Sequence, residues 1–214
     1  IDEAIMMCQA ESASSPTLRI YRWLYPCVSI GRFQSLDDIL NREGALPVVK
    51  RPTGGGIVFH NEFSFTYSIV YREDSFVSPK GVSNSYRKIH NGISKGLKSL
   101  GIGAALHMPG LNGRKSLSSK FCFSSPCEFD IVCGNRKIAG AAQRRRYGVV
   151  LHQGEVSLGL DVWPKWSYNV SKIAIMTGLS EQLEARFVEG RLSEKERILA
   201  EELNEAKRLI CQAT

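Results

Sequence analysis

Three consecutive glycines give this chain a place where its main chain could contact a ligand directly. Gly54, Gly55 and Gly56 follow Arg51 and Thr53 and separate two short apolar runs. Glycine lets another molecule approach the backbone, and successive exposed N–H groups can bind an anion or a carbonyl oxygen. Arg51 would add a planar cation with several donors. Most glycine-rich turns are only flexible hairpin loops, so this motif alone leaves both interpretations open.

Lys137 is the second candidate, because it interrupts an otherwise apolar strand pattern. It precedes Ile138, Ala139 and Gly140, and burying an ammonium without a partner is costly. One interpretation places its side chain at a solvent-facing edge of a sheet. The other places it in a ligand cleft, where its charge could stabilise a carbonyl or phosphate oxygen as negative charge develops there.

Both motifs resemble those of the lipoate-protein ligase and ligase-like octanoyltransferase family, which shares its catalytic fold with biotin ligases. The string from Lys50 to His60 is similar to that family's arginine-glycine-glycine-glycine-histidine loop, with Lys50 where the family usually has a first arginine. The string from Gly134 to Arg145 is similar to the strand that carries its essential lysine. Further similarity at 16–23, 28–34 and 152–154 extends the resemblance over roughly residues 1–160.

The resemblance implies a role for individual residues. Lys137 would be the essential lysine, and the glycine loop would close over the acyl chain or, in ligases, over an adenylate phosphate. The residues implied in substrate binding are Arg51, Thr53, Gly54, Gly55, Gly56, His60, Gly140 and Ala141. His60 could position the acyl chain or relay a proton, although a lone histidine at a strand end is more often structural. No metal-binding residue is implied.

Cys122 bears on which branch of the family the chain resembles. Residues 120–127, KFCFSSPC, match the stretch in which ligase-like octanoyltransferases carry the acyl group as a cysteine thioester, and Cys127 has no counterpart there. Ligases that activate free lipoate with ATP generally lack this cysteine. By this match Cys122 is a catalytic nucleophile, whose thiolate a nearby lysine cation would favour. The alternative is a small buried hydrophobic residue, the commonest role of a free cysteine.

The function implied is acyl transfer in protein lipoylation. Cys122 would accept an octanoyl or lipoyl group from a donor such as an acyl carrier protein and pass it to a lysine of an acidic lipoyl domain or carrier protein, without a cofactor. The alternative is a ligase that joins lipoate through a lipoyl-adenylate and requires ATP and Mg²⁺. Three glycines favour the ligase, whereas a chain without a separate C-terminal accessory domain favours the transferase.

A catalytically inactive module that binds an acidic partner is a third possibility. The net charge of +7 is concentrated in the runs Lys50-Arg51, Arg114-Lys115 and Arg144-Arg145-Arg146. No nucleic-acid-binding signature accompanies these runs, so an acidic protein is the expected partner rather than a nucleic acid. A pure binding module would not need the glycine loop, Lys137 and Cys122 together, and this argues for an enzyme.

Composition favours one globular domain. The chain has 214 residues, 43% of them hydrophobic, which suits a single catalytic domain with a C-terminal helical segment at about 181–214. No apolar run approaches the roughly 20 residues that cross a bilayer, and no secretory signal is seen. We therefore expect a cytoplasmic protein that is not bound to a membrane, with reduced cysteines that lack zinc-site spacing.

Hydrophobic periodicity predicts interleaved helices and strands. Helices are expected at 2–11, 36–42 and 82–100 and after the capping-box pair Ser193 and Glu196. Strands are expected at 17–23, 27–31, 47–51, 63–70, 129–132, 137–144 and 149–158, the last three as a meander, and residues 108–119 are expected to form an exposed loop. The predicted fold is α/β of the α+β type, with a mixed, largely antiparallel central sheet flanked by helices.

Overall fold

A computed structural model describes residues 1–214 except 13, 36–45, 78–80, 109–120, 160–166 and 213–214. Its helices are α1 (Asp2–Glu11), α3 (Val82–Ser99), α4 (Tyr168–Leu183) and α5 (Glu194–Gln212). Its strands are β1 (Thr17–Tyr21), β2 (Cys27–Ile30), β3 (Val48–Lys50), β4 (Val58–His60), β5 (Ser64–Arg72), β6 (Ala104–Leu106), β7 (Ile131–Cys133), β8 (Arg136–Arg146) and β9 (Val149–Ser157).

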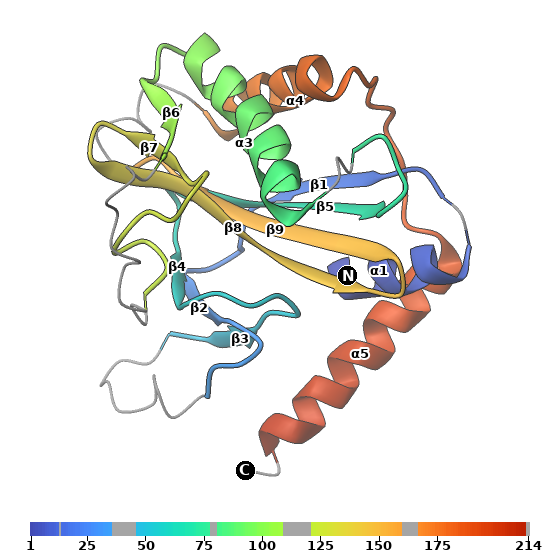
Figure 1. The fold of residues 1–214 in the computed structure, drawn as a ribbon. Coiled ribbons are helices and arrows are strands. Elements are labelled where there is room, and N and C mark those ends of the chain that lie inside the picture. Colours follow the sequence, from blue (N-terminus) through green and yellow to red (C-terminus); the bar gives the residue numbers. More distant parts are fainter. Residues whose placement is uncertain (13, 36–45, 78–80, 109–120, 160–166, 213–214) are drawn as a thin grey trace.

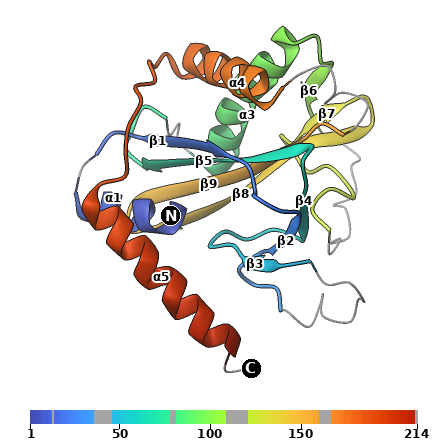
Figure 2. The same ribbon diagram turned by 180° about the vertical axis from the view of Figure 1, so that it is seen from behind.

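The strands form two sheets. The six-stranded sheet has the order β1-β5-β9-β8-β7-β6, and every pairing in it is antiparallel. The three-stranded sheet has the order β3-β2-β4, with β2 and β3 parallel. Helices α3 and α4 cover one face of the large sheet, and α1 and the small sheet lie on the opposite side (Figures 1 and 2). The predicted fold class is confirmed, but the sequence did not predict a second sheet.

The main core lies between the large sheet and the α3–α4 pair. Strands β5 and β9 are buried over eight of their nine residues, so both faces of the sheet are covered at its centre. Helix α3 contributes Ile89, Ile93 and Leu97, which recur every four residues and are fully buried. This spacing places them on one face of the helix, as the sequence predicts.

Glycines bring α3 and α4 into close contact. A Cβ atom built on Gly96 would lie closer than 3.0 Å to backbone atoms of Ala174 and Ile175, and one on Gly178 would meet the backbone of Gly92 and Gly96 just as closely. Real Cβ atoms essentially never show such separations. The two helices therefore pack backbone against backbone, which only glycine permits here.

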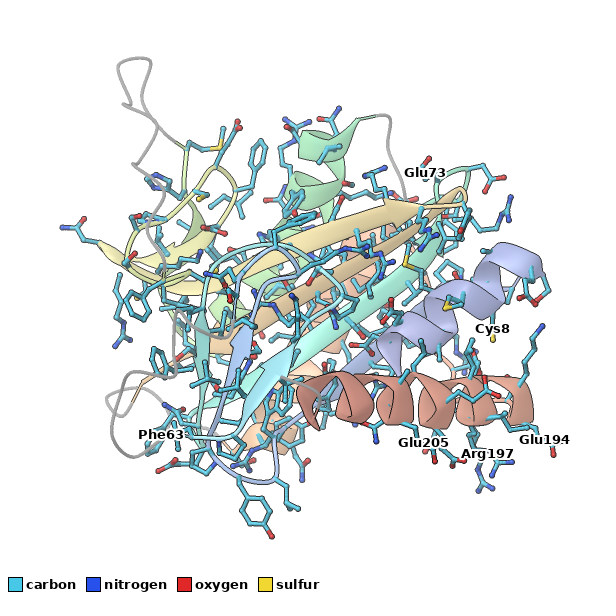
Figure 3. All side chains as sticks on the ribbon, turned by 90° about the horizontal axis from the view of Figure 1, so that it is seen from below. Cys8, Phe63, Glu73, Glu194, Arg197 and Glu205 are labelled. Carbon is cyan, nitrogen blue, oxygen red and sulfur yellow. The ribbon has the colours of Figure 1, made fainter. Side chains whose placement is uncertain are left out.

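The opposite face is held together by a buried carboxylate at the start of α1. Asp2 accepts hydrogen bonds from Ser68 on β5 (2.9 Å) and Gln153 on β9 (2.6 Å), and it forms an ion pair with Arg19 on β1. These contacts fix α1 against three strands. Helix α5 runs beside α1, with Glu194, Arg197 and Glu205 along it (Figure 3).

Most of the strongly periodic elements appear where they are predicted. Helix α1 has the predicted bounds, and β7–β9 form the expected meander. The capping box is confirmed, because the Ser193 N–H donates to Glu196 Oε2 at 2.7 Å and the Glu196 N–H to Ser193 Oγ at 3.2 Å. Helix α4 and strand β6 were not predicted. The expected helix at 36–42 and nearly all of the expected loop at 108–119 lie outside the described residues.

None of the helices in the described ranges combines the length and the apolar character that crossing a membrane requires.

Gly96→Ala should destabilise the protein although alanine is the better helix former. Helix propensity would contribute about 1 kcal/mol, but a methyl group that meets backbone cannot be relieved by a rotamer change, and such overpacking costs about 1–3 kcal/mol or more. We expect urea denaturation to show a net loss of about 2 kcal/mol. Gly190→Ala is the control, because nothing lies within 4 Å of its Cβ position. Equal stabilities of the two variants would contradict the close packing.

Candidate active site

Arg51 holds the glycine loop from within. Its Nη1 donates to the carbonyl oxygen of Ser29 at 2.8 Å and to the Ser29 hydroxyl at 2.7 Å. Its Nη2 donates to the carbonyl oxygens of Gly54 at 3.1 Å and Gly56 at 2.7 Å. Burial lowers the pKa of Arg51, and interaction with Cys122 and Glu155 opposes that change. Both terminal nitrogens of the guanidinium thus bind the loop and β2 rather than pointing away from them.

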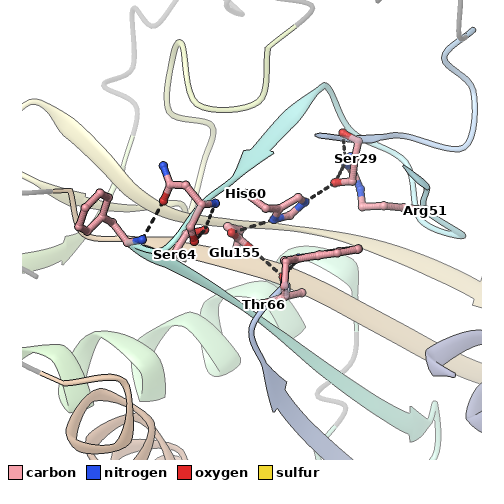
Figure 4. Close-up of polar contacts among 9 residues, drawn as sticks. Ser29, Arg51, His60, Ser64, Thr66 and Glu155 are labelled. Carbon is pink, nitrogen blue, oxygen red and sulfur yellow. Dashed lines mark hydrogen bonds and ion pairs between the residues drawn. The ribbon is translucent and has the colours of Figure 1, made fainter. Parts of the chain in front are cut away.

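His60 continues this network into the large sheet. Its Nε2 lies 2.6 Å from the Ser29 hydroxyl, and its Nδ1 lies 2.9 Å from Oε1 of Glu155 on β9. Thr66 donates to the other Glu155 oxygen at 2.6 Å, and the Trp23 indole donates to Thr66 at 2.9 Å (Figure 4). His60 is only 3% exposed. The structure therefore places it as a link between the two sheets.

The remaining loop residues are positioned by close backbone contacts. Gly55 has φ of 89°, a conformation that residues with side chains rarely adopt. A Cβ on Gly31 would collide with the Gly55 carbonyl oxygen, so a glycine is required there as well. Thr53 is buried and donates its hydroxyl to Gln153 at 2.9 Å. Thr53 thus anchors the loop to β9.

Cys122 is attached to the strand that follows the glycines. Its N–H donates to the carbonyl oxygen of Ile57 at 2.9 Å, and Phe121 forms a parallel β-bridge with Ile57. The rings of Phe121 and Phe59 stack with centroids 5.9 Å apart. Cys122 is a half-buried free thiol. The end of the glycine loop and Cys122 are therefore neighbours in space although 64 residues lie between Ile57 and Cys122 in the sequence.

Lys137 completes the cluster, and it does not lie at a solvent-facing edge. The residue is 7% exposed, and its Nζ lies 2.8 Å from the Cys122 carbonyl oxygen and 3.7 Å from Cys122 Sγ. Asp130 Oδ2 is 2.7 Å from the same nitrogen. Burial acts against the ammonium, but Cys122 and Asp130 more than offset it, and the pKa of Lys137 is raised above its ordinary value.

Gly140 and Ala141, which are adjacent on β8, have different neighbours. A Cβ on Gly140 would lie closer than 3.0 Å to Lys137 Nζ and to Asp130 Oδ1, so this glycine makes room for the ion pair. Ala141 packs against the core and, with Tyr86 and Asp130, lines a cavity of about 270 Å³ at the start of α3. The neighbour of the glycine loop on β8 is instead Ala142, 3.6 Å from the Cβ position of Gly55.

The basic runs have different surroundings. Arg144 and Arg145 form ion pairs with Glu3 and Glu73. They belong to the end of β8 opposite Lys137, and Arg146, the last residue of that strand, is nine residues or about 30 Å away along it. Arg114-Lys115 lies outside the described residues. Within the described ranges, no three His, Cys, Asp or Glu side chains gather in a way that could hold a metal ion.

The site also contains Ser29, Asp130 and Glu155, which connect the predicted residues to one another and were not predicted as site residues. Glu155 carries the same kind of signal as Lys137, because it is a charged residue inside an expected strand. Asp130 lies at the start of the same meander. Nothing in the sequence distinguishes Ser29 from other strand serines.

The chain is similar to known proteins over most of its length. The profile of the lipoyl protein ligase A/B catalytic domain matches residues 1–203. The chain belongs to this family. An octanoyltransferase LipM of Clostridioides difficile is 32% identical to it, with 96% of the chain and 89% of that relative aligned. The LipM protein of Symbiobacterium thermophilum is 41% identical over 169 residues, which are 76% of the chain and 61% of that relative.

The chain spans about three-fifths of the length of several curated relatives that it matches.

Solved structures of the lipoyl protein ligase family share its fold. A putative lipoate protein ligase of Thermoplasma acidophilum superposes with a TM-score of 0.74 at 26% identity, covering 96% of this chain and 87% of its own. A lipoate-protein ligase A bound with ATP superposes with a TM-score of 0.71 at 27% identity, covering 94% and 86%.

Arg51→Lys should loosen the glycine loop although the charge is retained. A lysine cannot reproduce the two-pronged donation to Ser29, Gly54 and Gly56, and each charge-assisted bond lost costs about 1.5–3 kcal/mol. We expect the amides of Arg32 and Cys122, which donate to the carbonyl oxygens of Thr53 and Ile57 at the two ends of the loop, to exchange with deuterium at least about tenfold faster. Arg87→Lys is the matched control, since Arg87 makes an exposed contact with Asn84. Unchanged exchange in Arg51→Lys would show that the guanidinium does not hold the loop.

Proposed function

We propose that this chain is an acyltransferase of protein lipoylation, with Cys122 as the nucleophile and Lys137 as the cation that assists it. The observation that carries the proposal is the placement of Lys137 Nζ 3.7 Å from Cys122 Sγ inside a largely buried site. The relatives named octanoyltransferase support acyl transfer as the reaction. The pairing of Cys122 with Lys137 also favours an enzyme over an inactive binding module.

In the first half-reaction the Cys122 thiolate attacks the carbonyl carbon of an octanoyl or lipoyl thioester, for which an acyl carrier protein is the proposed donor. A new C–S bond forms at Cys122, and the C–S bond to the donor breaks. The donor leaves as a thiolate and takes up one proton. No group is oxidised or reduced, so the step needs no redox cofactor.

The tetrahedral intermediate of this step carries negative charge on the former carbonyl oxygen. The Cys122 N–H already donates to Ile57, so it is not available to that oxygen. Among the described residues, the donors that we propose are the ammonium of Lys137 and main-chain N–H groups of the glycine loop, which Arg51 holds in place. Each donor of this kind stabilises the transition state by about 3 kcal/mol.

In the second half-reaction a lysine amine of a lipoyl domain or carrier protein attacks the Cys122 thioester. A C–N bond forms, the C–S bond to Cys122 breaks, and the proton released by the amine restores the thiol. Conversion of a thioester to an amide is downhill without ATP. A bipartite ligase of Thermoplasma acidophilum described together with its E2 lipoyl domain has the same fold and supports this class of acceptor.

A lipoate-protein ligase is the second candidate, because family members have been solved with ATP and with lipoic acid. A ligase would use ATP and Mg²⁺ as co-substrates and would need no cysteine nucleophile. The terminal nitrogens of Arg51 donate to carbonyl oxygens of the loop and of Ser29. Arg51 therefore has fewer N–H donors left for an adenylate phosphate than the sequence motif suggests. The Cys122–Lys137 contact favours the transferase.

We also propose that the described elements form one catalytic domain that works in the cytoplasm. One continuous core joins the large sheet to α3 and α4, and the described cysteines are free thiols, the state that a reducing compartment maintains.

The transferase should acquire one octanoyl group when it is incubated with octanoyl-acyl carrier protein. Intact-mass spectrometry should detect the adduct, hydroxylamine should remove it, and Cys122→Ala should lack it because the sulfur that carries it is gone. Cys127→Ala is the matched control and should be acylated like the wild type. An adduct that persists in Cys122→Ala and disappears in Cys127→Ala would show that Cys127, and not Cys122, carries the acyl group.

The same preparations separate the transferase from the ligase. A ligase would modify a lipoyl domain with free lipoate and ATP, release pyrophosphate, and retain this activity in Cys122→Ala. That result, together with an unmodified wild-type mass, would replace the proposed function by the ligase.

A further inference from the structure

Asp130 is a buried carboxylate that pairs with Lys137. It is 4% exposed, and its Oδ2 lies 2.7 Å from Lys137 Nζ. The same oxygen accepts the N–H of Cys127 at 2.6 Å. A buried carboxylate with two donors on one oxygen is fixed in position and is not free to follow a mobile lysine.

The backbone that presents Asp130 is held in an unfavourable conformation. Phe129 has φ of 66°, a left-handed value that is unusual for a bulky residue. Its carbonyl oxygen lies 2.6 Å from His90 Nδ1, and His90 Nε2 lies 2.9 Å from the Tyr67 hydroxyl in the core. The Asp130 carbonyl oxygen accepts the N–H of His107 at 2.7 Å. Such strain persists where surrounding contacts over-determine it, which is common at functional sites.

The Lys137–Asp130 ion pair is closely surrounded by other atoms. Gly140 leaves no room for even one methyl group beside Lys137 Nζ and Asp130 Oδ1. Of the three N–H donors of the ammonium, Asp130 Oδ2 and the Cys122 carbonyl oxygen can take two, and Cys122 Sγ at 3.7 Å is in reach of the third.

We propose that Asp130 is a positioning residue for the acyl transfer: it holds the Lys137 ammonium so that the remaining N–H faces the Cys122 sulfur and the oxygen of the attacked thioester. This proposal rests on the proposed function. Asp130 acts through Lys137 and need not touch the substrate.

Charge adds to the geometric role of Asp130. In the part of the chain that the structure describes, the ionisable groups that interact with Lys137 are Cys122, Cys127, Asp130 and, from α3, His90. Burial favours the neutral amine, whereas Cys122 and Asp130 favour the ammonium and raise the pKa of Lys137. Replacing the carboxylate by an amide removes one of the opposing interactions and leaves burial in place. The pKa of Lys137 then falls, so Lys137 loses its proton at a lower pH.

Asp130→Asn tests this role, because an amide oxygen can still accept both hydrogen bonds while the charge is gone. In protein labelled with ¹³C at lysine Cε, the Lys137 resonance is assigned by its absence in Lys137→Arg and then titrated. We expect its midpoint to fall by at least about one pH unit, which is tenfold in proton affinity. Acylation of Cys122 by octanoyl-acyl carrier protein should slow at least tenfold at both pH 7 and pH 9, because the ammonium is no longer held beside the sulfur, and should slow further once the pH exceeds the lowered midpoint.

Gly140→Ala is a second variant that separates the two side chains without removing a charge. It should also lower the Lys137 midpoint and slow acylation at least tenfold. Gly103→Ala is its control, because the nearest atom to that Cβ position is 3.7 Å away, and it should behave like the wild type. Should one variant fail to fold, the other still provides both readouts.

The outcomes separate the two proposals. A Lys137 midpoint and an acylation rate that match the wild type across this pH range, in folded Asp130→Asn, overturn the role of Asp130 and leave the acyltransferase intact. The same result in folded Gly140→Ala has the same meaning. A wild-type protein that never forms the Cys122 adduct overturns the acyltransferase and the role of Asp130 with it.

Discussion

The site depends on a buried ammonium that must be paired. An isolated lysine cation at the position of Lys137 would be strongly destabilising, and breaking a buried ion pair typically costs about 3–5 kcal/mol. Asp130 and the carbonyl oxygen of Cys122 satisfy this requirement from the loop that also carries the thiol. Pairing the charge therefore brings the cysteine and the lysine together. One constraint determines both the local fold and the candidate chemistry.

The glycine loop reaches this cluster through a second chain of polar contacts. Arg51 binds the loop carbonyls and Ser29, and Ser29 meets His60, which pairs with Glu155 on β9. Glu155 and Gly140 face each other in the β8–β9 ladder, and Gly140 borders Lys137. The small sheet is thus fastened to the large sheet beside Cys122 and Lys137. Arg51 and His60, which the sequence presents as contacts to a ligand, therefore act largely by holding the backbone of the glycine loop and of the small sheet in place.

Periodic patterns made much of the fold predictable. The spacing of Ile89, Ile93 and Leu97 predicts a buried helix face, and the alternation of apolar and polar residues in 63–70 predicts a strand. Helix α4 escaped prediction because Val170, Ile173, Ile175 and Gly178 are poor helix formers and its buried positions include Ser171 and Gly178. The separate small sheet escaped because strands of three or four residues carry no signal of which partner they pair with.

The candidate site was predictable in its residue types more than in its contacts. The apolar residues around Lys137 left a solvent-facing edge and a ligand cleft as alternatives, and the structure adds its burial and its proximity to Cys122. Asp130 could not be assigned from sequence, because a single aspartate before a strand is usually a turn residue. Likewise, Arg51 turns its guanidinium toward the carbonyl oxygens of Ser29, Gly54 and Gly56. This orientation depends on the folded backbone and cannot be predicted from the residues next to Arg51 in the sequence.

A structure of the protein acylated on Cys122 would test the central claim most directly. Crystals grown after reaction with octanoyl-acyl carrier protein should show the acyl group on Sγ, with its carbonyl oxygen about 2.7–3.2 Å from Lys137 Nζ or from a glycine-loop N–H. Arg51 should still hold the loop in its present position. An acyl carbonyl that faces solvent, with neither Lys137 nor a loop N–H within hydrogen-bonding distance, would contradict the account.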